Sequence, residues 1–300
     1  MKKIMNKFIE EYLFYPKNIF QKFFSFFLLP FTFIYCLIVY FKFPRKQKDM
    51  KIPIISIGNI IVGGSGKTPF TINLANKLGN VAVVLRGYGR KSKGCIVVSK
   101  NGKILEDVEV SGDEAQEIAL STKASVIVSE NREEGIKKAK ELGSKVVILD
   151  DGFDKPFKKL NIVIDVKIKN SFCLPSGGYR YPRNFLKYAD IILKENKDFK
   201  RVVKVPKCEN CVLISAISKP ERLFEFVKID KYHFFIDHYD YKKEEIKEIL
   251  KKYKANTILT TKKDYVKLKK FGFNLKVIEL EFEISNEVMT KIEEYLVKYE

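Results

Sequence analysis

The chain has 300 residues, enough for one large domain or two modest ones. Hydrophobic residues make up 46% of it, which excludes global disorder because such a composition can bury a core. The formal net charge of +19 fits nucleic acid, an anionic membrane surface or a phosphorylated substrate as partner.

The first predicted element is an uncharged, aromatic-rich segment at 23–41 that lies between two lysine-rich flanks. It reaches the roughly 18 residues that a membrane-spanning helix needs, but Pro30 interrupts it and the two basic flanks give no orientation. A cleaved signal peptide is disfavoured because the apolar run begins late and no small-residue cleavage site follows. We therefore assign residues 1–48 to a membrane-associated hydrophobic helix lying in the interface, with its lysines on anionic head groups. A spanning helix and a helix buried against the rest of the protein are the alternatives.

From residue 49 onward, short apolar runs alternate with amphipathic segments, which is typical of a parallel sheet covered by helices on both faces. In the first set, strands are expected at 52–57, 81–85, 125–128, 145–149, 162–165 and 191–193, and helices at 68–78, 113–120 and 132–142. In a second set, strands are expected at 212–216, 233–236, 257–261 and 275–281, and helices at 220–227, 242–252 and 286–298. The polar stretch 194–210 separates the two sets, so we predict a nucleotide-binding core at 49–205 and a smaller α/β lobe at 206–300.

A glycine-rich segment stands between the first predicted strand and the first predicted helix of this core. In such a loop the backbone N–H groups close around phosphate oxygens, a lysine reaches the β- and γ-phosphates, and a hydroxyl binds Mg²⁺. The usual pattern begins with glycine where this chain has Ile61, but the strand–loop–helix context supports a nucleoside triphosphate site. The predicted nucleotide-binding residues are Ile61, Val62, Gly63, Gly64, Ser65, Gly66, Lys67 and Thr68.

Two adjacent carboxylates, Asp150 and Asp151, follow the strand predicted at 145–149. They would repel each other at the end of a buried strand without a cation, so we predict that they hold Mg²⁺ together with Thr68. A capped strand-to-loop turn is the alternative interpretation.

The five cysteines are scattered and odd in number, which predicts a reduced protein facing the cytoplasm rather than a secreted disulfide framework. Cys208 and Cys211 form a single C-x-x-C pair. Because zinc normally needs four ligands, this pair favours a turn before a strand over a metal site.

Taken together, these residues resemble the tetraacyldisaccharide 4′-kinase family, the lipid A 4′-kinases. The family is similar in having a non-glycine residue at the position of Ile61. Besides the glycine-rich segment, the matching motifs are Ser56-Ile57-Gly58-Asn59, Arg86-Gly87-Tyr88-Gly89-Arg90, Gly112-Asp113-Glu114, Leu149-Asp150-Asp151-Gly152-Phe153, Leu174-Pro175-Ser176-Gly177, Asp237-His238-Tyr239 and Leu259-Thr260-Thr261-Lys262-Lys263-Asp264.

The resemblance implies a kinase that uses ATP and Mg²⁺ to phosphorylate the 4′-hydroxyl of a tetraacylated glucosamine disaccharide 1-phosphate, a lipid A precursor. It implies a P-loop NTPase-like core with a second, smaller Rossmann-like lobe. It also implies a place at the cytoplasmic face of the bacterial inner membrane, on anionic lipids. We expect a monomer, and no nucleic-acid partner because the basic residues are spread along the chain without a recognised module.

The resemblance also assigns roles to single residues. Asp113 matches the catalytic aspartate, with a helix N-cap as the alternative, and His238 matches its partner. Lys67 would stabilise charge on the transferring phosphoryl group. The arginines proposed for phosphate contacts, with surface solvation as the alternative, are Arg86, Arg90 and Arg180.

Two positions depart from the family pattern. Asp154 and Lys155 replace a Gln-His pair, and Tyr181 stands where the family has a glutamate, which puts any Mg²⁺ role there in doubt.

The main rival is a membrane-associated GTP-binding switch or transport protein, since Thr261-Lys262-Lys263-Asp264 mimics a guanine-recognition motif. Against it, Phe153 occupies the position at which an Asp-x-x-Gly motif needs glycine. A non-enzymatic, membrane-anchored nucleotide-binding scaffold is a second rival.

Overall fold

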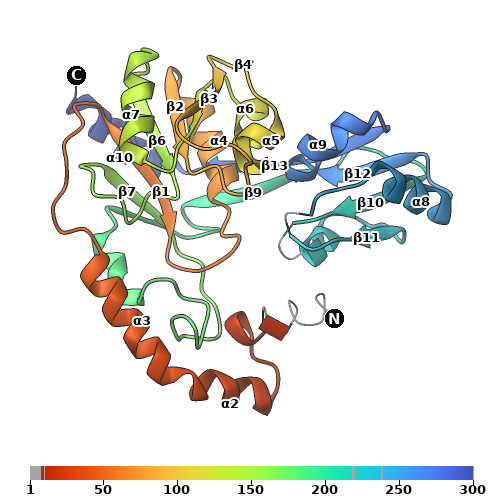
Figure 1. Cartoon of the computed structure of the whole chain (residues 1–300), viewed down its shortest axis with the longest axis horizontal. Coiled ribbons are helices and arrows are strands. Elements are labelled where there is room, and N and C mark those ends of the chain that lie inside the picture. Colours follow the sequence, from red (N-terminus) through yellow and green to blue (C-terminus); the bar gives the residue numbers. More distant parts are fainter. Residues whose placement is uncertain (1–7, 10, 218–219, 238, 300) are drawn as a thin grey trace. The chain divides into compact units, whose positions relative to one another are not determined.

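The computed structural model describes residues 8–299 except 10, 218–219 and 238, and shows a mixed α/β fold with two sheets (Figure 1). The larger sheet has eight strands in the order β4-β3-β5-β2-β6-β1-β7-β8. Its strands are β1 (Ile54–Asn59), β2 (Val81–Leu85), β3 (Ile96–Lys100), β4 (Lys103–Ile104), β5 (Ser125–Val128), β6 (Val146–Asp150), β7 (Leu160–Ile164) and β8 (Ile191–Leu193).

The large sheet is mainly parallel, as the continuous apolar runs predict. β1 pairs in parallel with β7, β7 with β8 and β2 with β5, whereas β3 runs antiparallel to both β4 and β5. Every residue of β1, β2, β5, β6 and β7 is buried. Strands covered on both faces leave no room for an alternating polar pattern, which is why their sequences are almost wholly apolar.

The second sheet has five strands in the order β11-β10-β12-β13-β9. They are β9 (Phe199–Lys204), β10 (Cys211–Ser215), β11 (Tyr232–Phe234), β12 (Thr257–Thr261) and β13 (Leu275–Ile284). β10 pairs in parallel with β11 and β12, and β12 pairs in parallel with β13.

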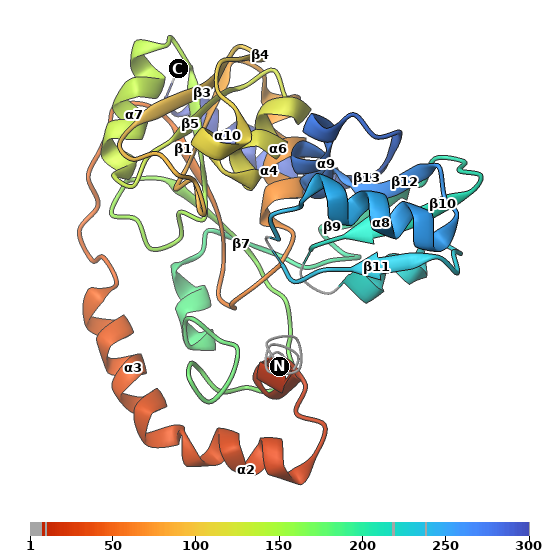
Figure 2. The same ribbon diagram turned by 45° about the vertical axis from the view of Figure 1, so that its right-hand side comes forward.

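The helices lie close to the predicted ranges, except that the helix expected at 220–227 is a turn of 3₁₀-helix, and several shorter elements were not predicted. The α-helices beyond the N-terminal region are α4 (Lys67–Leu78), α5 (Val108–Ser111), α6 (Asp113–Ser121), α7 (Arg132–Glu141), α8 (Lys243–Tyr253), α9 (Lys262–Leu268) and α10 (Asn286–Val297). Turns of 3₁₀-helix cover Arg183–Tyr188, Pro220–Glu225 and Lys269–Phe271. In Figure 2, α8 and α9 lie beside the strands of the second sheet.

Residue contacts divide the chain into two compact units. The first contains residues 1–67, 149–199 and 285–300, and the second contains residues 68–148 and 200–284. The domain boundaries that the sequence places at 48 and 205 stay predictions.

The N-terminal hydrophobic segment forms two helices where the sequence suggests one. They are α2 (Ile19–Phe27) and α3 (Leu29–Lys42), bent by 53° (Figure 1). Pro30 lies in the first turn of α3, where its missing N–H and fixed φ suit a helix start but end the preceding hydrogen-bond ladder. Within the described residues no single helix has the length and hydropathy to cross a bilayer, and this pair reaches both only when taken together.

These two helices bury polar side chains and expose apolar ones. Gln21, Ser25 and Thr32 are buried. The exposed apolar side chains of the pair are Ile19, Phe20, Phe23, Phe26, Phe27, Phe31, Phe33, Ile34, Leu37, Ile38, Tyr40 and Phe41. This polarity is the reverse of that of a water-facing helix, and an apolar patch this continuous marks an interaction surface.

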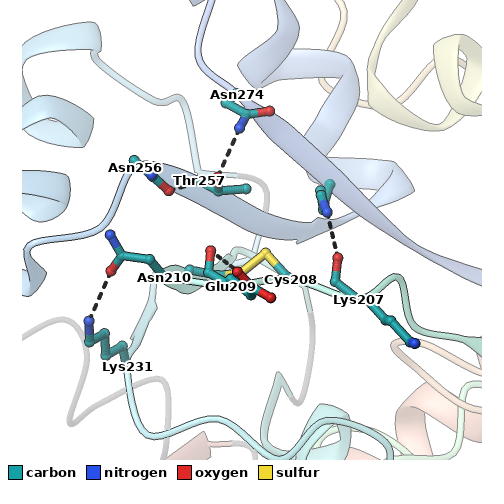
Figure 3. The surroundings of a disulfide bond; sticks show 10 residues. Lys207, Cys208, Glu209, Asn210, Lys231, Asn256, Thr257 and Asn274 are labelled. Atoms are coloured by element: carbon teal, nitrogen blue, oxygen red, sulfur yellow. Dashed lines mark hydrogen bonds between the residues drawn. A yellow bond between two sulfur atoms is a disulfide. The ribbon is translucent and has the colours of Figure 1, made fainter.

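Cys208 and Cys211 form a disulfide, with Cα atoms 6.0 Å apart, at the start of β10 (Figure 3). The predicted turn before a strand is therefore present, whereas the expectation of reduced cysteines does not hold for this pair. A four-residue turn brings two Cα atoms into the range that a disulfide accepts, so local geometry explains the pairing. Cys36, Cys95 and Cys173 are free thiols.

Candidate active site

The glycine-rich segment runs from the end of β1 to the first residue of α4, at the carboxyl edge of the large sheet. Gly63 and Gly66 have φ values of 80° and 88°, a conformation that favours glycine. The loop is fixed on one side by Asn59 Nδ2, which donates to Ser65 Oγ at 2.8 Å, and on the other by Val62 N, which donates to Gly178 O at 2.9 Å. A parallel sheet opens its ligand site at this edge, so the loop lies where a phosphate group would bind.

Three charged side chains meet beside this loop. Lys67 Nζ is 3.6 Å from Asp151 Oδ1, and Arg180 Nη1 is 3.3 Å from Asp151 Oδ2. Burial lowers the pKa of the Arg180 guanidinium, but Asp151 and Tyr181 together outweigh burial, and the net pKa is raised. The structure thus brings together Lys67 and Arg180, which the sequence predicts at phosphates, and Asp151, which it predicts at Mg²⁺, with two cations on one carboxylate.

The backbone after β6 is fitted closely against β1. Asp151 has φ 57° and donates its N–H to Ile57 O at 2.9 Å. A Cβ on Gly58 would lie 2.7 Å from Phe153 Cβ, so the motif glycine permits this contact. Lys159 closes the loop by donating from Nζ to the carbonyl oxygens of Phe153 and Lys155, and burial lowers its pKa to about 8.

The two carboxylates at the end of β6 fit the chemistry of Mg²⁺. Asp150 ends the strand and is only 4% exposed, Asp151 follows it, and Thr68 is the second residue of α4. Mg²⁺ is held by one or two carboxylates together with water and substrate phosphates, and does not need a dedicated cage. Accordingly, no cluster of three or more acidic, histidine or cysteine ligands is found among the described residues.

Tyr181, at the position of the family's glutamate, is a core residue in this chain. It is 8% exposed and packs against Phe43, Phe153 and Phe185, with ring centroids 5.4 to 6.0 Å away. Burial raises the pKa of its hydroxyl, so the side chain is neutral. Tyr181 thus belongs to an aromatic cluster in this chain.

Asp113 is the first residue of α6 and therefore does not occupy its N-cap position. Gly112 takes the N-cap position with φ 84° and makes no side-chain capping bond. A Cβ on Gly112 would lie only 2.8 Å from Tyr88 O. The glycine therefore allows this motif to pack closely against the Arg86–Arg90 motif. Asp113 Oδ2 instead lies 2.8 Å from Lys267 Nζ, in α9.

The other predicted site residues differ in their surroundings. Arg90 is 3% exposed in its side chain, pairs with Glu130 at 2.5 Å and donates to Gly94 O at 2.6 Å, so it orders its own loop. Arg86 is exposed at the end of β2. His238 lies outside the described residues. The phosphate contacts of both arginines and the role of His238 stay predictions.

The motif at 261–264, which resembles a guanine-recognition motif, stabilises the fold through Asp264. Asp264 is fully buried. Its carboxylate accepts hydrogen bonds from Ser215 Oγ, Tyr241 Oη, Thr261 Oγ1 and Ala216 N, at 2.8 to 3.1 Å. A carboxylate saturated by four donors cannot receive a base, so this motif gives no support to a GTP-binding switch.

The sequence motifs missed Thr32 and Tyr35 in α3, which hold a loop at 170–181 that lies between the N-terminal helices and the glycine-rich loop. On one side Thr32 Oγ1 donates to Ser176 Oγ at 2.7 Å, and Tyr35 Oη donates to Arg180 O at 3.0 Å. On the other side Arg180 N donates to Ile60 O at 2.8 Å. Isolated polar residues in an apolar helix were the available signal, because such residues need a buried partner.

Comparisons with known proteins show the family to which this chain is similar. The model of the family described as tetraacyldisaccharide-1-P 4′-kinase (LpxK) matches residues 24–207 and 194–297. The tetraacyldisaccharide 4′-kinase of Aliarcobacter butzleri is 55% identical over 302 residues, covering 96% of each chain, and that of Helicobacter pylori is 42% identical over 299 residues, covering 97% of this chain and 96% of its own. The crystal structure of LpxK from Aquifex aeolicus in complex with ATP superposes with a TM-score of 0.74 at 28% identity, covering 92% of this chain and 99% of that one.

Proposed function

The chain belongs to the tetraacyldisaccharide 4′-kinase family, and on this basis we propose that residues 61–68 bind the phosphates of ATP beside Lys67, Asp151 and Arg180. The enzyme transfers the γ-phosphate of ATP to the 4′-hydroxyl of a tetraacylated glucosamine disaccharide 1-phosphate in lipid A biosynthesis. The observation that carries the site assignment is the pairing of Asp151 with two cations beside the glycine-rich loop.

The charge arrangement suggests how these residues act. Lys67 and Arg180 carry N–H donors that can bind an anion. The γ-phosphate would compete with the Asp151 carboxylate for these donors, and they would then stabilise the charge of the transferring group. Asp113 is the proposed acceptor that orients the 4′-hydroxyl and takes its proton. Asp150, Asp151 and Thr68 would hold Mg²⁺, which neutralises charge on the phosphates when bound.

We further propose that α2 and α3 lie on the cytoplasmic face of the inner membrane. Their exposed aromatics supply the apolar face of an interfacial helix pair, and the basic flanks suit anionic head groups. An acylated substrate resides in that membrane, so the surface would bring the enzyme to its acceptor.

Charging the apolar face is expected to release the protein from membranes. Phe23 and Phe27 are 69% and 65% exposed, and burying each in lipid contributes about 1.5 to 3 kcal/mol. Phe23→Glu combined with Phe27→Glu should therefore lower partition into vesicles containing anionic phospholipid by at least about 100-fold. Phe226→Glu, at an aromatic 46% exposed in the other unit, is the matched control and should bind as wild type. Unchanged binding of the double variant would contradict the membrane proposal.

The site proposal is tested by following labelled γ-phosphate from ATP to the acylated disaccharide in mixed micelles. We expect transfer by the wild type, its loss when a chelator removes Mg²⁺, and its recovery when Mg²⁺ is added back. GTP should be a poor donor. Transfer that persists in chelator would reject the Mg²⁺ assignment, and a strong preference for GTP would reject the assignment of ATP.

A further inference from the structure

Lys267 is a buried lysine that lies next to Asp113. The residue is 6% exposed, although an unpaired ammonium is rarely found inside a protein. Its Nζ lies 2.8 Å from Asp113 Oδ2 and donates to Tyr239 O at 2.9 Å. One ammonium therefore connects α9, the start of α6, and the Asp237–Tyr239 motif that follows β11.

The pair is shielded from water on both sides. The side chains of Lys267 and Asp113 are 7% and 16% exposed. An ion pair in such surroundings is weakly screened by salt, and a cation in contact with a carboxylate favours its ionised form. The ammonium also fixes the carboxylate in space, because its second bond goes to a backbone carbonyl and not to a mobile side chain.

Building on the proposed role of Asp113, we propose that Lys267 is a positioning residue for phosphoryl transfer. It holds the Asp113 carboxylate ionised and oriented, and it ties the backbone of Tyr239 to that carboxylate. A general base must be ionised to accept a proton, so this contact would extend activity toward lower pH.

Other charged and titratable groups face the same region. These groups come from three parts of the chain: Lys263 in α9, Asp237 and Tyr241 after β11, and Glu114 and Glu117 in α6. Lys263 Nζ pairs with Asp237 at 2.9 Å, and burial raises the pKa of Glu117 to about 7. None of these groups substitutes for Lys267, since its ammonium is in direct contact with the Asp113 carboxylate.

The test is the pH dependence of kcat/KM for phosphate transfer in Lys267→Met, Lys267→Gln and Lys267→Arg. Loss of the charge should move the acidic limb upward by about 1 to 3 pH units, because a contacting cation lowers a carboxyl pKa by that amount. Lys267→Arg keeps the charge and should keep the limb near its wild-type position. Lys267→Gln keeps a donor for both partners, so it provides the same readout where Lys267→Met does not fold. Lys270→Met removes an exposed lysine nearby and should leave the profile unchanged.

Asp113→Asn in the same assay separates this inference from the site proposal. If Asp113→Asn turns over as wild type, the assignment of Asp113 as base fails, and the role of Lys267 with it. If Asp113→Asn loses activity while folded Lys267→Gln keeps the wild-type acidic limb, the Lys267 inference alone is overturned. An upward shift in Lys267→Gln together with a wild-type limb in Lys267→Arg supports it.

Discussion

Asp113→Asn is expected to lower kcat for phosphate transfer by about 10²- to 10⁴-fold, the range in which positioned acid–base groups contribute. Asparagine fills the same space but cannot accept the proton of the 4′-hydroxyl. KM for ATP should stay near its wild-type value because this residue does not belong to the glycine-rich loop. Steady-state transfer at saturating ATP measures both quantities.

Glu114→Gln is the matched control for this prediction. Glu114 is the next residue on α6, also in its first turn, and we assign it no part in the reaction. A wild-type kcat in Asp113→Asn would contradict the assignment, whereas similar losses in both variants would point to a change in the helix and not to a base.

Lys67→Met is expected to lower kcat by about 10²- to 10³-fold, as removal of a single donor to developing charge does elsewhere. The ammonium is only 16% exposed and lies beside the glycine-rich loop, where the γ-phosphate is expected. Asp151 keeps its pairing with Arg180 in this variant, so the fold should persist. The loss should fall mainly on kcat, with weaker ATP binding as a second effect.

Lys77→Met supplies the comparison on the same helix. Lys77 is exposed in the last turn of α4, and its replacement should leave transfer and thermal unfolding as in the wild type. Equal kcat values for Lys67→Met and the wild type would exclude Lys67 from the transfer step.

The strands of both sheets were largely predictable from sequence. The expected ranges 81–85, 125–128, 191–193 and 257–261 coincide with β2, β5, β8 and β12, because a strand buried on both faces appears as an apolar run between polar stretches. The predicted mixed α/β class with a large parallel sheet is confirmed.

Some helices and strands were not predicted because their sequence patterns are short or mix polar and apolar residues. The hairpin of β3 and β4 turns at Asn101 and Gly102, which have φ values of 49° and 83°, and an Asn-Gly pair is a known hairpin signal. β9 lies inside the polar stretch 194–210, where its three basic residues hide a strand: Lys200, Arg201 and Lys204. Pro30 signals the break between α2 and α3, and a proline at this place also argues against one spanning helix.

The candidate site residues could be selected from motifs, but their contacts could not. Lys67, Asp151 and Arg180 were each identified by local patterns, and the fold brings them together. The pairing of Asp113 with Lys267 joins residues far apart in sequence, and no local pattern encodes such a pair. Asp264 shows the opposite case, since its motif suggested a ligand contact and the fold gives it four internal donors.

The hydrogen bonds of the 170–181 loop have a practical consequence for any attempt to produce a detergent-free enzyme by truncation. Asn170 Nδ2 donates to Tyr12 O at 2.8 Å and to Ser25 Oγ at 3.2 Å, and further bonds reach Thr32 and Tyr35. Cutting the chain after residue 42 would strip these partners from a segment whose other side holds the glycine-rich loop. The hydrophobic N-terminus is thus part of the structure that supports the glycine-rich loop, and a soluble variant is better sought by changing its exposed aromatics than by deleting it.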